Sequence, residues 1–469
     1  MVAGDTDMQH ANGRRLRDIA LATDLYQMTM GASYHALEMN DLATFSLMVR
    51  KPPANRSFMV VAGIQEALDR LADLRFDDEV LEYLRSTGQI RADFIDTLAN
   101  FRFKGDVWAV PEGRIVFPDE PIIEVQAPII QAQLAETLVI NSLHYAMTVA
   151  SKAARCRIAA GDASLLEFGL RRIAGIEAGL IAARSAYIAG FNATSNLLAG
   201  QQYGMPVAGT VAHSFVESRP SELDAFRVFR DTFPGPVTLL IDTYDTIRGA
   251  EHAIQVAKEA EASGTRVGAV RLDSGDIGEL SVQVRRMLDD AGLTGVRIIA
   301  SGGLDEYSIS ELVAAGAPID SYGVGTQIGN SVDAPTLDMA YKLVEYAGQG
   351  RLKLSTGKIS LVGPKQVWRA TDRDGTPQRD VIATRDEPWP GDRWEPLLQP
   401  VMRSGRQMVH SSLLEARETF SRELKRMPAD LRRIDRVAEY PVTRSNVLNR
   451  RQDAAVQQVR HRESGEAME

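Results

Sequence analysis

Cysteine is nearly absent from this sequence, because Cys156 is the only one among 469 residues. A single cysteine excludes an intramolecular disulfide and any zinc site built from several thiolates. Long apolar runs are also missing, since no stretch approaches the roughly 20 residues that a membrane-spanning helix needs. Residues 1–17 are polar and lack a hydrophobic signal core, so we expect a cytoplasmic protein.

Runs of basic residues are absent too. The chain has 53 Lys and Arg residues against 62 Asp and Glu residues, a formal net charge of −9. This balance argues against a nucleic-acid coat and against binding to an anionic membrane. With 44% hydrophobic and 25% charged residues, the composition is typical of an ordinary globular protein. A length of 469 residues predicts two or three domains.

The first third of the chain changes from helical to strand-like patterning. Residues 23–101 have the apolar spacing of helices, interrupted by one expected strand over 44–50. Short alternating runs over 103–126 are divided by turn residues, which predicts a small antiparallel sheet. A long helix is expected over 133–160.

Seven short β-like runs recur in the middle of the chain, and helix-length segments lie between most of them. Strands that alternate with helices predict parallel pairing with right-handed crossovers. Seven such units favour an α/β barrel, and a doubly wound sheet is the alternative. The runs cover residues 165–169, 186–191, 207–213, 237–242, 266–272, 296–301 and 321–325.

The predicted fold class is α/β: an irregular, open α/β barrel with an additional α+β domain built from N-terminal and C-terminal segments. Strands are expected again over 341–346, 352–355 and 366–370, followed by polar helices near 411–426. The last residues are charged, glutamine-rich and free of aromatics, which predicts a disordered tail. The predicted boundaries are 14–130 for the N-terminal domain, 131–335 for the barrel with the active site, 336–443 for the C-terminal segment that rejoins the N-terminal domain, and 444–469 for the tail.

Residues just past the predicted strands are the candidates for chemistry, because reacting groups of α/β barrels lie where strands end and loops begin. They converge on Arg, Asp, Gly and one His, which indicates an anionic substrate with possible Mg²⁺. The set is Arg171, Arg172, Ser195, His213, Asp242, Asp245, Arg271, Asp273, Asp276, Ser301, Gly302, Gly303, Gly323 and Gly325.

Two glycine clusters follow the last two predicted strands: Gly302 with Gly303, and Gly323 with Gly325. In barrels, backbone N–H groups at this place hold a phosphate, and a Cβ atom would block its close approach. Ordinary turn formation is the alternative for each cluster alone. Their paired position favours a phosphate site.

The segment from Arg271 to Asp276 carries an arginine and two carboxylates on one turn. Asp273 and Asp276 are candidates for ribose hydroxyls or for Mg²⁺ held by a diphosphate. Asp276 is also a plausible N-cap of the following helix, with Glu279 completing a capping box. The two roles are compatible.

His213 is one of seven histidines and is expected to end a barrel strand. Asp242, one strand later, could accept a hydrogen bond from one imidazole nitrogen and select the tautomer. The other nitrogen would then be nucleophilic towards a phosphoryl group. Outside the barrel, Arg50 and Lys51 belong to a basic turn that a solvated loop would also explain, and Tyr26 could simply lie in the first turn of a helix.

Six motifs in chain order resemble the nicotinate phosphoribosyltransferases, and the resemblance runs from about residue 20 to 445. They are Thr23-Asp-Leu-Tyr-Gln-Met-Thr-Met30, Glu167-Phe-Gly-Leu-Arg-Arg172, Gly209-Thr-Val-Ala-His-Ser-Phe215, Asp242-Thr-Tyr-Asp245, Arg271-Leu-Asp-Ser-Gly-Asp276 and Gly323-Val-Gly-Thr326. The resemblance implies synthesis of nicotinate mononucleotide from nicotinate and phosphoribosyl diphosphate, with release of diphosphate. It also implies coupling to ATP through a phosphohistidine.

The resemblance assigns a role to each matching residue. It implies that His213 is the phosphorylated histidine, that Asp242 orients it, and that Phe168 and Tyr26 sandwich the pyridine ring. Tyr26 would come from the second subunit of a head-to-tail homodimer with shared active sites. The remaining implied contacts are Arg171 with the pyridine carboxyl or a phosphate, Ser195 favouring nicotinate over the amide, Arg271 and Asp273 with the ribose, Gly302, Gly303, Gly323 and Gly325 with the 5′-phosphate, and Arg50 and Lys51 with diphosphate from the partner.

Two other functions stay open at this point. Quinolinate phosphoribosyltransferase resembles this fold and substrate, but it would need a denser set of basic residues and has no phosphohistidine. A non-catalytic nucleotide-binding protein of the same fold would be expected to lose His213 or the Arg271–Asp276 set, and this sequence keeps both.

Overall fold

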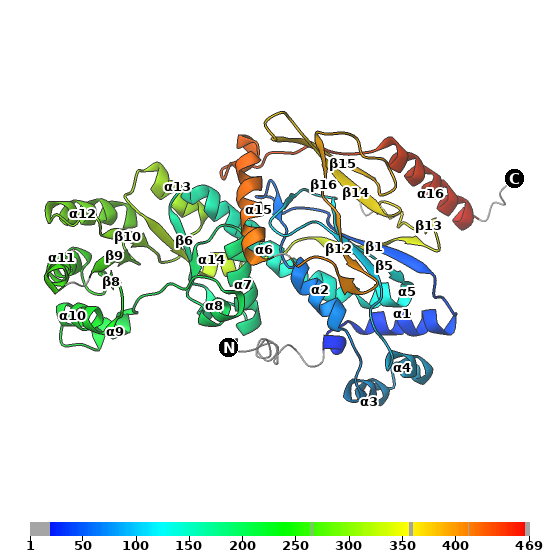
Figure 1. Cartoon of the computed structure of the whole chain (residues 1–469), viewed down its shortest axis with the longest axis horizontal. Helices are drawn as coiled ribbons and strands as arrows, with labels where there is room; N and C mark the ends of the chain where they lie inside the picture. Colours follow the sequence, from blue (N-terminus) through cyan, green and yellow to red (C-terminus); the bar gives the residue numbers. More distant parts are fainter. Residues whose placement is uncertain (1–18, 264–265, 356–359, 411, 465–469) are drawn as a thin grey trace, which may run out of the picture. The chain divides into compact units, whose positions relative to one another are not determined.

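The computed structural model describes residues 19–263, 266–355, 360–410 and 412–464. The chain forms two compact units (Figure 1). Unit 1 contains the described residues up to Thr148 together with 336–432 and those from Val437 on, and unit 2 contains 149–335 with 433–436. Among the described residues, no helix is long and apolar enough to cross a membrane.

Unit 1 is built on a seven-stranded antiparallel sheet in the order β13-β12-β1-β5-β3-β17-β18. The sheet joins both ends of the chain, because β12 pairs with β1 from Met339 opposite Val49 to Tyr346 opposite Ala43. This confirms the expected α+β domain made of N-terminal and C-terminal segments. The strands are β1 (Leu42–Val49), β3 (Asp106–Ala109), β5 (Pro121–Pro128), β12 (Met339–Tyr346), β13 (Gln349–Gly350), β17 (Gln399–Arg403) and β18 (Arg406–Gln407).

Two smaller sheets and a set of helices complete unit 1. In α2 the residues Ile64, Ala67, Leu68 and Leu71 are buried, so the apolar face of an amphipathic helix covers the core. The elements are β2 (Met59–Val60) paired with β4 (Ile115–Val116); β14 (Lys365–Thr371), β15 (Pro377–Thr384), β16 (Trp394–Pro396) and β19 (Val442–Arg444) in the order β16-β14-β15-β19; and η1 (Ile19–Leu21), α1 (Leu25–Ala36), α2 (Ile64–Asp73), α3 (Asp78–Thr87), α4 (Ala92–Leu98), α5 (Ile129–Leu134), α15 (Leu413–Arg426), η3 (Ala429–Arg432) and α16 (Asn446–Ser464).

A buried ion cluster ties α15 to the four-stranded sheet of unit 1. The guanidinium of Arg369 on β14 is fully buried and bonds Asp380 Oδ2 on β15 at 2.6 Å and Glu423 Oε2 on α15 at 3.0 Å. It lies 5.4 Å from the ring centre of Phe117 and 5.9 Å from that of Tyr440. Arg369 is therefore the counter-charge of the buried Asp380 and shares Glu423 with Arg114, whose Nε lies 3.3 Å from Glu423 Oε2. Without these cations, burial would strongly disfavour the ionised carboxylates.

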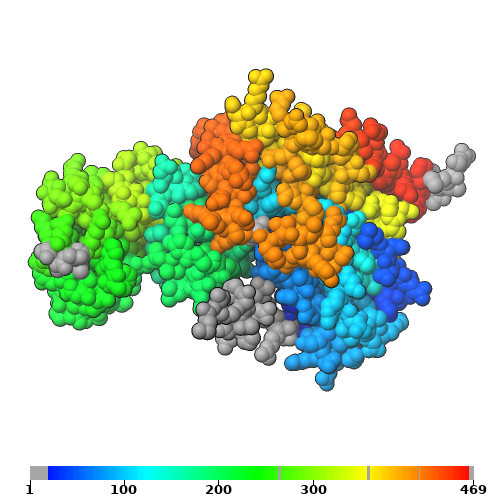
Figure 2. Space-filling view, viewed as in Figure 1, coloured from blue at the N-terminus to red at the C-terminus, as the bar shows by residue number. Residues whose placement is uncertain are grey.

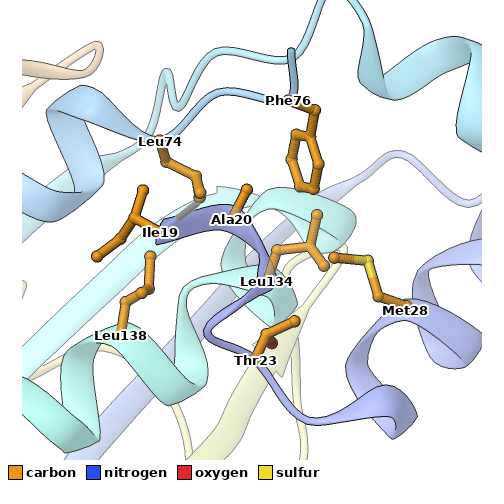
Figure 3. A pocket seen from close by; sticks show the side chains of 8 residues that line it. All are labelled: Ile19, Ala20, Thr23, Met28, Leu74, Phe76, Leu134 and Leu138. Atoms are coloured by element: carbon orange, nitrogen blue, oxygen red, sulfur yellow. The ribbon is translucent and has the colours of Figure 1, made fainter. Parts of the chain in front are cut away.

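A small apolar cavity of about 10 Å³ lies in the core of unit 1 (Figure 3). That volume is room for about one water molecule, and a cavity with apolar walls of this kind has few polar partners to hold one. The cavity is therefore a packing defect and not a substrate site. Its lining side chains are Ile19, Ala20, Thr23, Met28, Leu74, Phe76, Leu134 and Leu138.

Unit 2 is an open α/β barrel whose six parallel strands run in the order β7-β6-β11-β10-β9-β8. Figure 1 shows the helices that accompany β8, β9 and β10. The elements are β6 (Ser164–Glu167), η2 (Leu170–Arg172), α7 (Ile176–Ile188), β7 (Ala193–Thr194), α8 (Leu197–Tyr203), α9 (His213–Glu217), α10 (Glu222–Thr232), β8 (Val237–Leu240), α11 (Thr246–Ser263), β9 (Val267–Leu272), α12 (Ile277–Asp290), β10 (Arg297–Ala300), α13 (Glu306–Ala314), β11 (Ser321–Val324) and α14 (Thr326–Gly329).

The barrel is interrupted between residue 207 and β8. The first and last strands pair, since β6 lies beside β11, and Val207 continues the sheet only as a single bridge to Thr194. Past that bridge, the Thr210 hydroxyl donates to the carbonyl of Thr238 on β8 in place of a strand ladder. The expectation of an irregular, open barrel is thus confirmed.

Three of the expected strands are wrong. Residues 186–191 finish α7 and the turn after it, residues 207–213 contribute only the bridge at Val207, and residues 352–355 form no strand. A short apolar run fits the end of a buried helix as well as a strand, so periodicity alone does not separate the two. The backbone at Gly190, with φ of +97°, ends the helix after Ala186–Ile188 has continued it.

The domain boundaries and the tail also differ from expectation. The division between the units falls inside α6 (Glu136–Ala160), between Thr148 and Val149, and not at 130/131. Residues 446–464 form α16 and not a disordered tail; Leu448 is fully buried, and Gln452 Nε2 donates to the carbonyl of Ser360. Figure 2 shows α16 in red beside the yellow β12–β13 region. Residues 14–18, 411 and 465–469 lie outside the described part.

We expect removal of the central cation of the buried cluster to destabilise unit 1 strongly. Arg369→Met leaves Asp380 buried without its counter-charge and leaves Glu423 with only Arg114 and the more distant Arg426, a loss of about 3–5 kcal/mol in the free energy of unfolding. Urea unfolding followed by circular dichroism measures it. In the control Arg85→Met the exposed pair with Asp96 is lost, for which we expect less than about 1 kcal/mol. Equal effects of the two substitutions would contradict this account.

Candidate active site

The carboxyl ends of the parallel strands of unit 2 meet at one edge of the sheet. Hydrogen bonds continue the ladder beyond the strands, since Phe168 N donates to Val324 O at 2.9 Å and Ser301 N donates to Leu272 O at 2.8 Å. Residues that lie far apart in the sequence are therefore neighbours at this edge. Most of the predicted site residues follow these strands, as the sequence indicated.

Arg271, Asp273 and Ser301 form a closed triangle of hydrogen bonds at this edge. Arg271 Nη2 donates to Asp273 Oδ1 at 2.6 Å, Arg271 Nε donates to Ser301 Oγ at 2.7 Å, and Ser301 Oγ donates to the same Asp273 Oδ1 at 2.6 Å. Partial burial pushes the pKa of Asp273 up, but the hydrogen bond from Ser301 and the charge of Arg271 outweigh burial, so the pKa lies below its usual value. Asp273 is consequently ionised at neutral pH.

Asp242 is held against the turn that follows Asp273. Its Oδ2 accepts the backbone N–H of Asp273 at 2.9 Å and the Ser274 hydroxyl at 2.7 Å. Its Oδ1 is buried and has no hydrogen-bond partner among the described residues. A buried acceptor without a partner is rare in folded proteins, and at a strand end it marks a place where a ligand group or a proton can bind.

His213 begins α9 instead of ending a strand, which changes its partners. Its Nδ1 lies 3.2 Å from Thr243 Oγ1, and its Nε2 lies 4.0 Å from Asp273 Oδ2. The expected hydrogen bond between His213 and Asp242 is not formed in this structure. The His213 Nδ1 atom instead contacts the hydroxyl of the next residue, Thr243, while Asp242 Oδ2 holds the turn at residues 273 and 274.

Close packing against Phe168 explains two of the four site glycines. A Cβ atom on Gly323 would lie 2.8 Å from Phe168 Cδ2, and one on Gly325 would lie 2.6 Å from the Phe168 carbonyl oxygen. The Arg271 guanidinium lies 5.7 Å from the centre of the Phe168 ring, within range of a cation–π interaction. Gly323 and Gly325 therefore make room for Phe168, a reason that the sequence did not reveal.

The other two glycines differ from each other. A Cβ atom on Gly302, where φ is +93°, would lie 1.9 Å from the carbonyl oxygen of Asp273. A Cβ atom on Gly303, where φ is +77°, would meet no heavy atom within 4 Å. Gly302 is thus required by the turn that carries Asp273, whereas the open side of Gly303 is compatible with the predicted phosphate site.

Asp276 caps the helix that follows it, as expected. Its Oδ1 accepts the backbone N–H of Glu279 at 3.0 Å at the start of α12.

Within the described ranges, no group of three or more His, Cys, Asp or Glu side chains is arranged to hold a metal ion. The donor chemistry still suits Mg²⁺, because Asp242 Oδ1 has no partner and carboxylate oxygens are the ligands that Mg²⁺ prefers, usually together with substrate phosphates. The Mg²⁺ role of Asp273 and Asp276 stays a prediction.

Arg171 and Ser195 are exposed at the same strand ends. Arg171 lies in η2, and its guanidinium has no hydrogen bond or ion pair with any described residue. Ser195 follows β7, and its backbone N–H donates to the carbonyl of Glu167 at 2.9 Å. A guanidinium with no partner among the described residues is a suitable ligand for the carboxylate of a small anion.

Tyr26, Arg50 and Lys51 belong to unit 1. Tyr26 lies in the first turn of α1 with 46% of its surface exposed. Lys51 is exposed and makes no polar contact with the described residues. Arg50 forms an ion pair with Asp338, so its charge is partly neutralised, which the sequence did not predict.

Three polar residues of the site were not predicted from the sequence. Thr243 contacts His213, and Ser274 contacts Asp242. Glu167 accepts hydrogen bonds from Gly169 and Thr194. Each lies inside or beside one of the motifs that were singled out. Thr243 and Ser274 could have been predicted as site residues, because each carries a hydroxyl directly after a strand-end aspartate. Glu167 could have been predicted because it is the charged residue of strand β6.

Comparisons with known proteins agree on one family. The family model for the nicotinate phosphoribosyltransferase N-terminal domain matches residues 21–144, and that for the nicotinate phosphoribosyltransferase family matches residues 163–359. A nicotinate phosphoribosyltransferase of Mycobacterium tuberculosis is 46% identical over 96% of this chain and 95% of its own length. One of Bacillus subtilis is 40% identical over 79% of this chain and 77% of its own. The crystal structure of human nicotinic acid phosphoribosyltransferase superposes with a TM-score of 0.83 at 30% identity, covering 92% of this chain and 99% of that one.

Alanine substitutions at Gly302 and Gly303, the adjacent glycines that follow β10, should lower the free energy of unfolding by different amounts. Gly302→Ala forces the Asp273 turn to move and adds backbone strain, so we expect a loss of about 3 kcal/mol or more in the free energy of unfolding. Gly303→Ala meets open space and carries only the cost of its positive φ, about 1–2 kcal/mol. Thermal unfolding of both variants compares them. If Gly303→Ala were as destabilising as Gly302→Ala, the packing argument would be wrong.

Proposed function

Because the chain belongs to the nicotinate phosphoribosyltransferase family, we propose that it joins nicotinate to the ribose of phosphoribosyl diphosphate and couples this to ATP hydrolysis. Diphosphate leaves the anomeric carbon as the C–O bond breaks, and the pyridine nitrogen forms the new C–N bond. The product is nicotinate mononucleotide, a precursor of NAD. The observation that carries the proposal is the connected group of Arg271, Asp273, Ser301, Asp242 and His213 at one sheet edge.

The pyridine pocket of the proposal consists of Phe168, Arg171 and Ser195. The Phe168 ring offers a face for stacking, and the free guanidinium of Arg171 offers two parallel N–H donors to a carboxylate. Ser195 brings no negative charge, whereas an acidic side chain at this position would repel nicotinate. The pocket thus selects a planar ring that carries a carboxylate.

The ribose and phosphates are assigned to the triangle around Asp273 and to the glycine turns. Displacement at the anomeric carbon develops positive charge on the ribose, and an ionised carboxylate such as Asp273 can hydrogen-bond the sugar hydroxyls next to it. The open backbone at Gly303 suits the 5′-phosphate. Mg²⁺, when bound, would neutralise charge on the leaving diphosphate, and Asp242, Asp273 and Asp276 are the carboxylates available to hold it.

His213 is the proposed phosphoryl acceptor. If Nδ1–H donates to Thr243 Oγ1, then Nε2 carries the lone pair that attacks the terminal phosphorus of ATP. The P–O bond to ADP breaks as the N–P bond forms, and water later hydrolyses the phosphohistidine. In this proposal Thr243 takes the orienting role that the sequence assigned to Asp242.

A homodimer would complete the site in this proposal. The partner subunit's Tyr26 would cover the second face of the pyridine ring, and the partner subunit's Lys51 would contact diphosphate. The exposure of Tyr26, and of Lys51 with no polar contact to the residues that the structure describes, supports these roles. Arg50 is a weaker candidate, because its ion pair with Asp338 must open first.

Substrate choice is the direct test of the proposal. Purified enzyme is incubated with phosphoribosyl diphosphate and either nicotinate, nicotinamide or quinolinate, with and without ATP, and the mononucleotide products are quantified. We expect product from nicotinate, stimulated by ATP. In Ser195→Asp the added negative charge should raise the KM for nicotinate at least about tenfold, since two like charges about 4 Å apart near a protein surface repel by roughly 4 kcal/mol, more than the about 1.4 kcal/mol of a tenfold change. A preference for quinolinate or nicotinamide would overturn the assignment.

Loss of the imidazole should separate ATP hydrolysis from synthesis. His213→Ala removes the proposed phosphoryl acceptor, so we expect no ATP hydrolysis and no stimulation by ATP, with slower ATP-independent synthesis retained. Radiolabelled ATP with acid-labile, base-stable label on the protein checks the intermediate. His252→Ala is the matched control, because His252 pairs with Glu222 between α10 and α11. Undiminished ATP coupling in His213→Ala would refute the phosphohistidine.

A further inference from the structure

Glu167, at the end of β6, is a buried carboxylate without a counter-charge. Only 1% of its surface is exposed, and no described cationic side chain pairs with it. Burial raises the pKa of Glu167 although hydrogen bonds from Thr194 and Gly169 act against the shift. Burial of a carboxyl group without a counter-charge costs folding free energy unless hydrogen bonds compensate. The hydrogen bonds of Glu167 therefore indicate why a carboxylate is kept at this position.

Both carboxylate oxygens of Glu167 accept hydrogen bonds, and from different loops. Oε1 accepts the backbone N–H of Gly169, and Oε2 accepts the hydroxyl of Thr194 at 2.6 Å. The Thr194 hydroxyl in turn accepts the backbone N–H of Asn196 at 3.0 Å. The backbone carbonyl of Glu167 accepts the N–H of Ser195 at 2.9 Å. One residue therefore fixes the loop after β6 and the loop after β7.

These two loops carry all three residues that line the pyridine pocket of the proposed function. Phe168 and Arg171 stand on either side of Gly169, and Ser195 follows Thr194 directly. We propose that Glu167 is a positioning residue for the pyridine substrate: its carboxylate sets the spacing between the Phe168–Arg171 loop and the Ser195 loop. This inference rests on the proposed function, because it presumes that these three residues hold nicotinate.

An amide cannot replace the carboxylate without changing the hydrogen bond to Thr194. Both direct partners, the Gly169 N–H and the Thr194 hydroxyl, donate, and a glutamine has one acceptor oxygen and one NH₂ group in the same plane. If the oxygen serves Gly169, the NH₂ group can only donate to the Thr194 hydroxyl, which also accepts from Asn196, and the hydroxyl proton loses the acceptor that Glu167 Oε2 provides. The Thr194 side of the pocket would then shift, while the volume of the side chain stays the same.

The test compares steady-state kinetics of Glu167→Gln with the wild-type enzyme, varying nicotinate and phosphoribosyl diphosphate separately. We expect the KM for nicotinate to rise at least about tenfold, with kcat changed less than about threefold and the KM for phosphoribosyl diphosphate unchanged. A merely structural role would not discriminate between the two substrates. Thr194→Val, which loses the hydroxyl, should reproduce the effect, and Thr194→Ser, which keeps it, should not.

A matched control uses a carboxylate at the opposite end of the same sheet. Asp320 Oδ2 accepts the backbone N–H of Ile298 at 2.7 Å, before β11 begins. Asp320→Asn weakens a similar carboxylate–backbone contact, so we expect it to leave both KM values unchanged. If Asp320→Asn raised the KM for nicotinate as Glu167→Gln does, the effect would be a general loosening of the sheet and the inference would fail.

Each outcome decides the matter. An unchanged KM for nicotinate in Glu167→Gln, or an equal rise in both KM values, overturns the inference while wild-type activity leaves the proposed function intact. If Glu167→Gln does not fold, the pair Thr194→Val and Thr194→Ser decides, since equal KM values for nicotinate in these two variants would overturn it. Failure of the wild-type enzyme to make nicotinate mononucleotide would refute the proposed function itself.

Discussion

The hydrogen-bond ladder between β6 and β11 is the constraint on which the site depends. It pairs the first strand of unit 2 with the last, placing Glu167 opposite Val324, and it continues through Phe168 N to the Val324 carbonyl. Because the backbones run this close, Gly323 and Gly325 have no room for a Cβ atom beside Phe168. The aromatic ring thus lies against the end of β11, within range of the Arg271 guanidinium on β9.

The charged side chains stabilise the fold in unit 1 and are available to bind a ligand in unit 2. In unit 1, Arg369 is fully buried and pairs with Asp380 and Glu423, so its charge holds β14, β15 and α15 together. In unit 2, neither the Arg171 guanidinium nor Asp242 Oδ1 has a hydrogen-bond partner among the described residues. A chain of net charge −9 can therefore present a site for anions, because the local arrangement and not the sum decides what binds.

Much of the fold was predictable because its segments have strong periodicity. The strands over 237–240 and 267–272 fall within their expected ranges, and helices over 246–263 and 277–290 occupy the helix-length segments expected after them. Short apolar runs were not predictable in the same way, and residues 186–191 proved to finish a helix. The C-terminal helix was missed because its composition is polar, and only its contacts with β13 and β15 reveal what stabilises it.

The sequence by itself determined which residue types lie at the strand ends, and with them the chemistry of the site, because parallel strands necessarily bring those ends to one edge. Only the tertiary structure decided how these residues pair. Hydrogen-bond partners depend on ångström-scale placement of loops, so Thr243 and not Asp242 contacts His213, and Asp242 holds the turn after Asp273. The role of Glu167 could not be predicted from the sequence for a similar reason. Glu167 joins two loops that become neighbours only when β6 and β7 pair.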